Sequence, residues 1–198
     1  MRKIIVSMNV TLDGFMAGPN CELDWHFNYW DEEMAICAGE ELSNADTILL
    51  GRITYKAMAK YWPFKATDPN YPREDIAFAD MMNNHNKIVF SKTLKKAKWN
   101  NTRLVKKNMQ KKILKWKQQP GKNMIVYGSG SIVSALMHGG LIDDYMLWVH
   151  PIILGTGKPL FRDLRDMHGL KLVDTRKFDS GVVILNYQDD KSRGGFFP

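Results

Sequence analysis

Two glycine-containing segments of the sequence have residue types that bind anions. In the first, Gly128-Ser129-Gly130-Ser131 follows the apolar run 123–127, which ends in Tyr127, and precedes a helical pattern. Unpaired amides at a helix N-terminus carry partial positive charge, and glycines allow a pyrophosphate to approach them. A tight turn in which Ser131 caps the helix is the alternative. The common dinucleotide fingerprint is incomplete, because Val133 stands in place of its third glycine.

The second segment places Gly51, Arg52 and Thr54 after the β-branched run 47–50. The planar guanidinium of Arg52 binds phosphate through several donors, and Thr54 adds a hydroxyl group. Arginine at a helix start opposes the helix dipole, which favours a bound anion there. An ordinary surface arginine is the alternative interpretation.

A third predicted strand, 87–90, ends in Ser91 and Lys92, which offer a hydroxyl group and an ammonium group. Ligands of open α/β sheets bind at the carboxyl ends of the strands. The three strand ends together therefore predict a site for a dinucleotide. The five histidines are scattered without a metal-binding spacing, so we predict no metal site.

The net charge of +7 is concentrated in one segment, because residues 92–122 contain twelve Lys or Arg and no Asp or Glu. One interpretation is a docking surface for nucleic acid or a phosphorylated ligand. We favour the other, a solvated face of an amphipathic helix, because Met109, Ile113 and Trp116 recur at helical spacing. On this interpretation Lys111, Lys112, Lys115 and Lys117 face solvent.

Composition places the 198-residue chain among globular proteins, with 44% hydrophobic and 25% charged residues. We expect a single domain over 1–190 and a loose tail over 191–198. Two cysteines, Cys21 and Cys37, do not form a disulfide framework, and a cytoplasmic location fits best. No apolar run is long enough for a membrane-spanning helix, so we expect no membrane association.

Short β-branched runs alternate with helical patterns, which predicts an α/β domain with a largely parallel sheet. From residue 144 onward the pattern becomes strand-rich, and Asp179-Ser180-Gly181 indicates a hairpin turn. We therefore expect an antiparallel hairpin at the edge of the sheet, and an excursion over 62–73. The predicted strands are 4–10, 47–50, 87–90, 103–105, 123–127, 145–154, 170–178 and 182–187. The predicted helices are 31–42, 53–61, 74–83, 108–118 and 131–138.

Several of these segments, in this order, resemble the reductase domain of riboflavin biosynthesis, a member of the dihydrofolate-reductase-like superfamily. The motifs are 11–18 after the first strand, 50–55, 127–131, 140–144 and 151–161, and the similarity covers about residues 2 to 188. The resemblance implies an eight-stranded, three-layer fold with helices on both faces, NADPH as cofactor, and a homodimer. It places Gly51, Arg52 and Thr54, together with Gly128 to Ser131, at the cofactor phosphates. Ser91 and Lys92 would lie near the adenosine 2′-phosphate.

The loop 11–25 is expected to lie beside the nicotinamide as a lid. Asp13 is our candidate for orienting the substrate or supplying a proton through water, and a turn-forming Asp before Gly14 is the alternative. Trp25 is expected to line the substrate pocket, or else to be a core residue. Asp31 is a second candidate for substrate contact, or an N-cap. Leu154 and Gly155 would form the opposite wall.

The leading hypothesis is an NADPH-dependent reductase of a small heterocyclic or ribosyl substrate, for example 5-amino-6-(5-phosphoribosylamino)uracil. Reduction of another C=N or C=O compound is the alternative within the same class. Folate is disfavoured, because the positions of the pteridine-binding carboxylate and the tail-binding arginine fall at Ala35 and His85. A non-catalytic nucleic-acid or nucleotide-binding protein that uses residues 92–122 is the alternative from another class.

Overall fold

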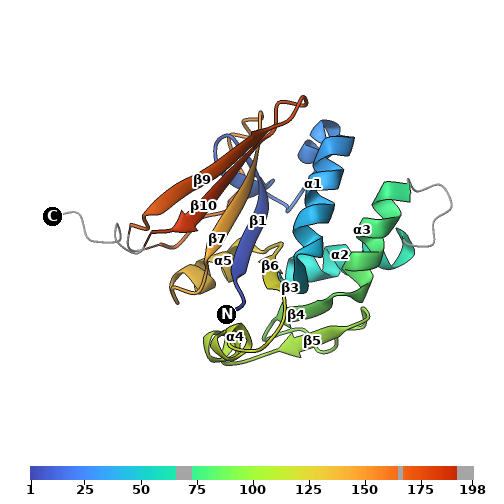
Figure 1. Cartoon of the computed structure of the whole chain (residues 1–198), viewed down its shortest axis with the longest axis vertical. Helices are drawn as coiled ribbons and strands as arrows, with labels where there is room; N and C mark the ends of the chain where they lie inside the picture. Colours follow the sequence, from blue (N-terminus) through green and yellow to red (C-terminus); the bar gives the residue numbers. More distant parts are fainter. Residues whose placement is uncertain (66–72, 165–166, 191–198) are drawn as a thin grey trace.

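The fold is a mixed α/β structure built on one eight-stranded sheet, with strand order β5-β4-β3-β6-β1-β7-β10-β9 (Figure 1). The computed structural model describes residues 1–65, 73–164 and 167–190. Strands β5 to β7 in that order are parallel, whereas β10 is antiparallel to both β7 and β9. The expected parallel sheet with an antiparallel C-terminal hairpin at its edge is therefore confirmed.

The strands of the large sheet lie close to the predicted runs. They are β1 (Ile4–Thr11), β3 (Ala45–Gly51), β4 (Asn86–Phe90), β5 (Thr102–Val105), β6 (Asn123–Val126), β7 (Asp144–His150), β9 (Leu170–Lys177) and β10 (Val183–Asp189). At the tip of the hairpin between β9 and β10, Gly181 has a φ of +87° and its amide bonds to the carbonyl of Phe178 at 3.0 Å. A glycine suits this turn because it adopts positive φ without steric cost.

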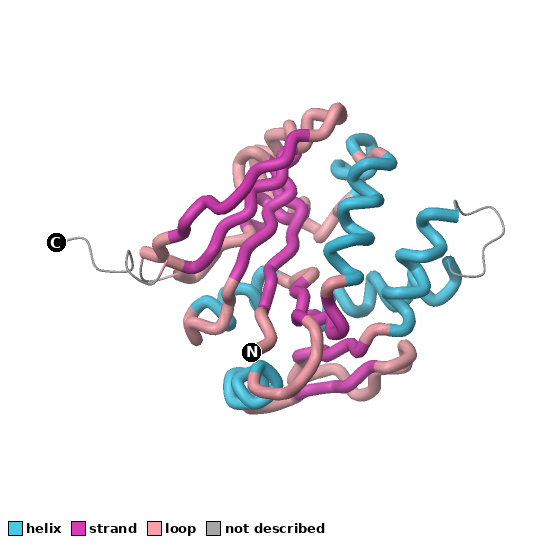
Figure 2. Tube along the Cα trace, viewed as in Figure 1, coloured by secondary structure: helices cyan, strands magenta, loops and turns pink. Residues whose placement is uncertain are grey.

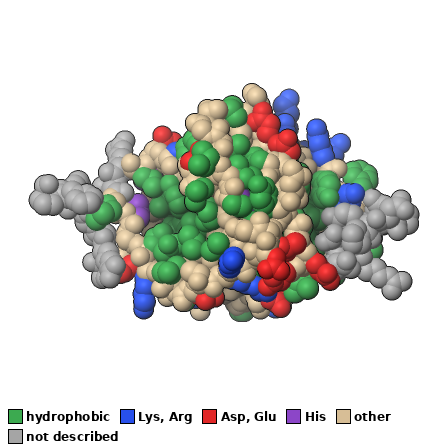
Figure 3. All heavy atoms as spheres, turned by 90° about the horizontal axis from the view of Figure 1, so that it is seen from above, with side chains coloured by type: hydrophobic (Ala, Val, Ile, Leu, Met, Phe, Trp, Pro, Cys, Tyr) green, Lys and Arg blue, Asp and Glu red, His purple; other side chains and the backbone are tan. Residues whose placement is uncertain are grey.

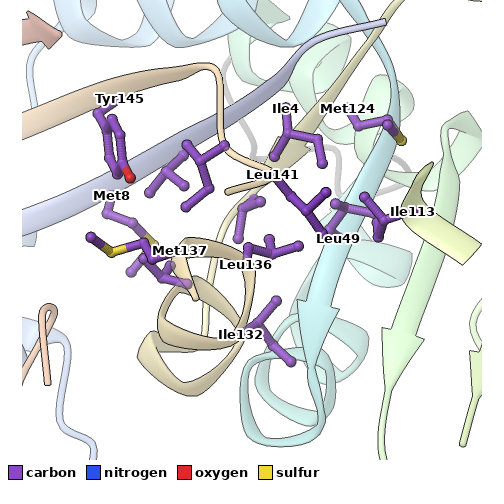
Figure 4. Close-up of a cluster of buried hydrophobic side chains, with 14 of the residues drawn as sticks. Ile4, Met8, Leu49, Ile113, Met124, Ile132, Leu136, Met137, Leu141 and Tyr145 are labelled. Atoms are coloured by element: carbon purple, nitrogen blue, oxygen red, sulfur yellow. The ribbon is translucent and has the colours of Figure 1, made fainter. Parts of the chain in front are cut away.

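Alternation along the strands separates two hydrophobic layers. In β1, Ile4, Val6, Met8 and Val10 point to one face and pack in the large cluster of Figure 4. Ser7 and Asn9, at the intervening positions, line a cavity on the other face. This follows from the two-residue period of a strand.

Helices cover both faces of the sheet (Figure 2). Residues of α4 (Met109–Lys117) and α5 (Gly130–Met137) belong to the cluster of Figure 4. Residues of α1 (Glu32–Ser43), α2 (Arg52–Lys65) and α3 (Arg73–Asn84) pack on the opposite face. The three-layer architecture is therefore confirmed, and among the described helices none is long and apolar enough to cross a membrane.

Three details differ from the sequence-based expectation. The predicted strand over 145–154 ends at His150, where Pro151 follows. Within the predicted excursion over 62–73, residues 62–65 belong to α2 and Arg73 begins α3, whereas residues 66–72 lie outside the described chain. The expected tail 191–198 also lies outside it and stays a prediction. The predicted lid loop contains a short strand, β2 (Phe15–Ala17), paired with β8 (Lys158–Pro159), and a 3₁₀ helix, η1 (Asp24–Tyr29).

The basic segment also differs from expectation at one residue. Lys117 does not face solvent: it is 5% exposed, and its Nζ donates to Asp143 Oδ2 at 2.5 Å and to the Leu141 carbonyl at 3.1 Å. This lysine is placed inward because it follows Ile113 by four residues and so lies on the same helix face. Trp99 is also buried, with its Nε1 donating to Asn83 Oδ1 at 2.7 Å.

Candidate functional site

The two glycine junctions predicted from the sequence are in direct contact. The amide of Gly51 donates to the carbonyl of Gly128 at 2.8 Å. A Cβ added to Gly51 would lie 2.4 Å from Ser129 Oγ and 3.2 Å from its backbone nitrogen. A Cβ on Gly128, whose φ is +114°, would lie 3.0 Å from Thr54 Oγ1. Only residues without side chains let the ends of β3 and β6 approach this closely.

Each junction opens directly into a helix. Helix α5 begins at Gly130 with Ser129 as its N-cap residue, so the expectation of Ser131 as the cap is wrong. The Ser129 side chain makes no capping bond and instead pairs with Ser131 Oγ at 2.8 Å. Helix α2 begins at Arg52, which is exposed and has no ion pair or hydrogen bond from its guanidinium within the described chain. The amides of both helix starts and this cation are thus available to an anion.

The third strand end carries a shallow pocket of about 310 Å³. Its lining includes Ser91 and Lys92, as well as Lys106 and Lys107, which directly follow β5. Ser91 Oγ accepts hydrogen bonds from the amides of Thr93 and Leu94, at 3.2 and 2.9 Å, and this turn orients the loop. Lys106 and Lys107 belong to the basic segment 92–122 and were not among the predicted site residues. Lys106 and Lys107 directly follow a strand, as Ser91 and Lys92 do, and this position could have predicted that they belong to the site.

A cavity of about 430 Å³ lies on the face of the sheet covered by α1, α2 and α3. Its lining comes from the sheet, from η1 and from these three helices, and consists of Ser7, Asn9, His26, Phe27, Trp30, Ala35, Ala38, Glu41, Met58, Tyr61, Trp62, Phe78, Met82, Tyr127 and Trp148. Phe27 and Trp30 remain 63% and 39% exposed. Seen from above, the molecular surface shows patches of hydrophobic side chains with acidic side chains beside them (Figure 3).

Tyr127 connects the cavity with the glycine junctions, because it lies between β6 and Gly128 and also lines the cavity. Its hydroxyl group is buried and has no hydrogen-bond partner in the described chain. Burial, and secondarily the charge of Glu41, raise the pKa of Tyr127 well above its ordinary value. Burial of a hydroxyl group without a hydrogen-bond partner costs free energy. A ligand that forms a hydrogen bond with the Tyr127 hydroxyl group would remove this cost.

Glu41 is the carboxylic acid of the cavity. Its Oε2 accepts a hydrogen bond from Ser7 Oγ at 2.8 Å, and Ser7 Oγ accepts one from Trp148 Nε1 at 3.2 Å. The other oxygen, Oε1, is buried and has no partner among the described residues. Burial raises the pKa of Glu41 to about 8, and the Ser7 hydrogen bond only partly opposes this. The group is therefore mainly protonated at neutral pH.

Neither Glu41 nor Ser7 was among the residues predicted from the sequence. The pair Glu40-Glu41 belongs to no recognised motif. Helical spacing was the available signal, because Glu41 follows the apolar Cys37 by four residues and so lies on the buried face of α1. A weaker signal was present in the first strand, where Ser7 and Asn9 interrupt an apolar run at alternate positions and therefore mark one face. That face carries the cavity.

An aromatic cluster borders the cavity at the end of β7. His150 is buried, and its Nε2 bonds to Asn9 Oδ1 at 2.8 Å; because that oxygen only accepts, Nε2 carries the proton. Burial and the nearby His26 lower the pKa of His150 to about 4, so the ring is neutral. Trp25 packs edge-on against His150 with ring centroids 5.2 Å apart, and its buried Nε1 has no partner in the described chain. Trp25 is absent from the cavity lining and contacts it only through His26, whose ring centroid lies 5.5 Å away; a contact between Trp25 and substrate stays a prediction.

The remaining predicted site residues lie outside the cavity lining. Asp13 accepts hydrogen bonds from Thr11 Oγ1 at 2.6 Å and from the amides of Leu154 and Gly155 at 3.3 and 2.8 Å. The Thr11 hydrogen bond lowers the pKa of Asp13. Its carboxylate thereby joins the lid loop to the 154–155 turn, and its catalytic role stays a prediction.

Asp31 caps α1, since its Oδ1 accepts from the amide of Met34 at 2.8 Å. This contact matches the N-cap alternative for Asp31. A contact between Asp31 and substrate stays a prediction, as does the wall formed by Leu154 and Gly155.

Comparison with known proteins places the chain in a family. The model of the RibD C-terminal domain matches residues 2–184. The chain belongs to the RibD C-terminal domain family. This is a reductase-like domain of the riboflavin-biosynthesis type, as the resemblance implied.

One relative of this RibD C-terminal domain is the uncharacterised protein YyaP of Bacillus subtilis (strain 168), which is 37% identical over 186 residues, 94% of each chain. A putative riboflavin biosynthesis protein from Shewanella sp. PV-4 has a TM-score of 0.74 at 20% identity and covers 96% of this chain and 99% of its own. A dihydrofolate reductase from Enterococcus faecalis, complexed with NADP(H), has a TM-score of 0.57 at 12% identity, with 96% and 97% covered. The two structures show that the fold is dihydrofolate-reductase-like.

Proposed function

We propose that this protein is an NADPH-dependent reductase whose substrate binds in the cavity beneath α1, α2 and α3. The observation that carries the proposal is the position of Tyr127. It is shared by the cavity and by the glycine junction, so a dinucleotide bound at Gly51 and Gly128 would have its reactive end beside the cavity. Ligands of open α/β sheets bind at this edge.

The residues present fit such a cofactor. Gly51 and Gly128 leave backbone space that a Cβ would fill, and the unpartnered guanidinium of Arg52 offers a phosphate contact. The pocket at Lys92, with Lys106 and Lys107, offers positive charge for a further phosphate. NADPH, when bound, supplies the hydride for the reduction. The protein's own part is to position both reactants and exclude water.

The cavity is suited to a flat, compact substrate. Trp30, Trp62, Phe78 and Trp148 supply aromatic walls, and aromatic rings pack favourably on planar ligands. Reduction of 5-amino-6-(5-phosphoribosylamino)uracil is the leading example, and another C=N or C=O compound is the alternative; dihydrofolate fits less well. A homodimer, which the family resemblance implies, and a cytoplasmic location, which the low cysteine content favours, stay proposals.

The test is a titration of the protein with NADPH and with NADH, followed by quenching of tryptophan fluorescence. The variant Lys92→Ala/Lys106→Ala/Lys107→Ala is compared with Lys111→Ala/Lys112→Ala/Lys115→Ala, which removes the same charge from exposed or half-exposed positions of α4. We expect the first triple variant to weaken NADPH binding by about 10-fold or more, and NADH binding much less, because charge-assisted phosphate contacts are lost. The second should bind both as the wild type does.

The same two variants test the nucleic-acid alternative. A binding protein that used residues 92–122 without catalysis would lose affinity for a duplex oligonucleotide in the α4 variant, and its salt dependence would become weaker. The buried Trp99 gives no support to base stacking by that residue. Failure of the wild type to bind NADPH would overturn the reductase proposal.

A further inference from the structure

We propose that Glu41 is the proton donor of the reduction, and that the substrate places the nitrogen or oxygen of its C=N or C=O bond at Glu41 Oε1. This proposal rests on the reductase function proposed above and names a catalytic residue for it. It also restricts the substrate to compounds that must gain a proton on a heteroatom when carbon receives the hydride.

The hydrogen bonds around Glu41 determine which oxygen carries the proton. The indole Nε1 of Trp148 is only a donor, so Ser7 Oγ must accept from it. The hydroxyl hydrogen of Ser7 is then directed to Glu41 Oε2, which acts as an acceptor. Oε1 is the oxygen without a partner within the described chain, and it belongs to a side chain that lines the cavity. A protonated Glu41 therefore carries its hydrogen on Oε1, the position from which a ligand can accept it.

The surroundings keep this acid neutral. Ala38 on α1, Phe78 and Met82 on α3, and Met58 on α2 line the same cavity, so apolar groups surround the carboxyl group. Burial disfavours the ionised form and raises the pKa of Glu41 to about 8.

The ionisable groups near Glu41 are few. Those that share the cavity are Tyr127 after β6, Tyr61 on α2 and His26 on η1, and burial lowers the pKa of His26. On α1 itself, Cys37 precedes Glu41 by one turn, and burial raises the pKa of its thiol. Arg176 of β9 is paired with Glu33 at 2.8 Å. The raised pKa values of Tyr127 and Cys37 and the lowered pKa of His26 keep these three groups neutral at pH 7, so none of them is a cation that favours the ionised carboxylate.

Atoms and electrons balance in the proposed step. A hydride adds to the substrate carbon, and the π electrons of the C=N or C=O bond move onto the heteroatom. The O–H bond of Glu41 Oε1 breaks, and its proton forms the new N–H or O–H bond. NADPH, when bound, would supply the two electrons that reduce the substrate, and Glu41 would be left as a carboxylate. Water from the open side of the cavity returns one proton, which restores the acid. Ser7 acts as a positioning residue, because its hydroxyl group holds Oε2 throughout.

The protonation state is measured first, without substrate. Protein labelled with ¹³C at the glutamate carboxyl carbons is titrated by NMR, and the Glu41 resonance is assigned as the one lost in Glu41→Gln but kept in the exposed-neighbour control Glu40→Gln. We expect a midpoint near pH 8 in the wild type. In Ser7→Ala the midpoint should rise further, because the lost hydrogen bond stabilised the ionised form. A wild-type midpoint near the ordinary 4.5 would overturn the proposal, since a carboxylate has no proton to donate.

The hydride step is measured next, in single turnovers with NADPH and 1-methylisatin, a flat ketone without an ionisable group. We expect the wild-type rate to fall above the NMR midpoint, by about tenfold per pH unit. Glu41→Gln should lose about 10²- to 10⁴-fold in rate while binding NADPH normally, and Glu40→Gln should keep the wild-type profile. In Ser7→Ala the pH above which the rate falls should increase together with the NMR midpoint.

The outcomes separate the two proposals. If the wild type binds NADPH and reduces the ketone, but Glu41→Gln retains both the rate and the alkaline limb, Glu41 is not the donor and the reductase function stands. If the wild type transfers no hydride to this ketone or to 5-amino-6-(5-phosphoribosylamino)uracil, the reductase function fails, and the donor role fails with it.

Discussion

The amide of Gly51 donates to the carbonyl of Gly128 at 2.8 Å, although 77 positions separate the two residues in the chain. This hydrogen bond joins the ends of β3 and β6, which are neighbours in the sheet. It brings Thr54 and Ser129 together at the junction. Thr54 lies where a Gly128 side chain would be, and Ser129 lies where a Gly51 side chain would be. The proposed phosphate site is therefore one continuous surface that belongs to two helix starts.

Substitution of Gly51 by Ala should open this junction. The new methyl group would lie 2.4 Å from Ser129 Oγ and 3.2 Å from the Ser129 nitrogen, so the β6 loop must shift. We expect a loss of about 1–3 kcal/mol in the free energy of unfolding, as for overpacked sites, and weaker NADPH binding. The matched control is Gly39→Ala on α1, where a Cβ meets nothing within 4 Å. That change should stabilise the helix by about 0.5–1 kcal/mol. Urea unfolding measures the change in unfolding free energy of both variants. A change of the same sign in the two variants would contradict the prediction.

Substitution of Arg52 by Ala should weaken NADPH binding by about 1–3 kcal/mol, because a charge-assisted phosphate contact is lost. NADH binding should fall by a similar amount, because both cofactors carry the pyrophosphate that would face this junction. Lys56→Ala, one turn later on α2 and also exposed, serves as the control and should bind both cofactors as the wild type does. Isothermal titration calorimetry at fixed ionic strength measures all four values for the two variants. A loss confined to NADPH would contradict a contact between Arg52 and the pyrophosphate.

The free energy of unfolding should contain a pH dependence that comes from Glu41. Its pKa is raised from 4.5 to about 8 in the folded state, so the folded protein holds a proton that the unfolded chain releases. Stability from this group is present below pH 4.5 and falls as the pH rises towards 8, by at most about 1.4 kcal/mol per pH unit. His150 acts in the opposite direction at lower pH, between about 4 and 6.5.

The difference in unfolding free energy between the wild type and Glu41→Gln isolates the Glu41 contribution, because His150 is present in both. We expect the variant to gain stability relative to the wild type between pH 5 and pH 8. Thermal unfolding at several pH values, with Glu40→Gln as the control, measures this difference. A difference that does not change with pH would refute a raised pKa at Glu41.

Within the basic segment, Lys117 should matter for stability and Lys115 should not. Lys117 is buried and pairs with Asp143, which is 30% exposed and also accepts from the amide of Ile4 at 2.7 Å. Lys117→Ala should cost about 2–4 kcal/mol, somewhat less than for a fully buried pair. Lys115→Ala, on the exposed side of the same helix, should change stability by less than about 0.5 kcal/mol. Guanidinium unfolding distinguishes the two, and similar values would show that the ion pair is not structural.

Much of the fold could be predicted from local patterns. The period of two in β1 and the helical spacing of Met109, Ile113 and Trp116 reflect burial of one face of each element. The continuous apolar run of β3 reflects burial of both its faces. Strand ends were less predictable: β7 stops at His150 because Pro151 follows, whereas the apolar pattern continues. The pairing of β2 with β8 joins segments about 140 residues apart and left no local signal.

The proposed phosphate-binding half of the candidate site could be predicted from the sequence. Glycines at strand ends, followed by helix starts, specify exposed amides wherever such strands are parallel and adjacent. The types and spacing of Gly51, Arg52 and Gly128 are therefore sufficient to predict an anion site at these strand ends. The substrate half was decided by tertiary structure alone. Glu41 becomes a buried acid only because α1 lies over β1, so that Ser7, 34 residues earlier, meets its Oε2 and apolar side chains from two further helices remove its water. Desolvation depends on the groups that surround a side chain in space, and the neighbouring residues in the sequence do not reveal which groups these are.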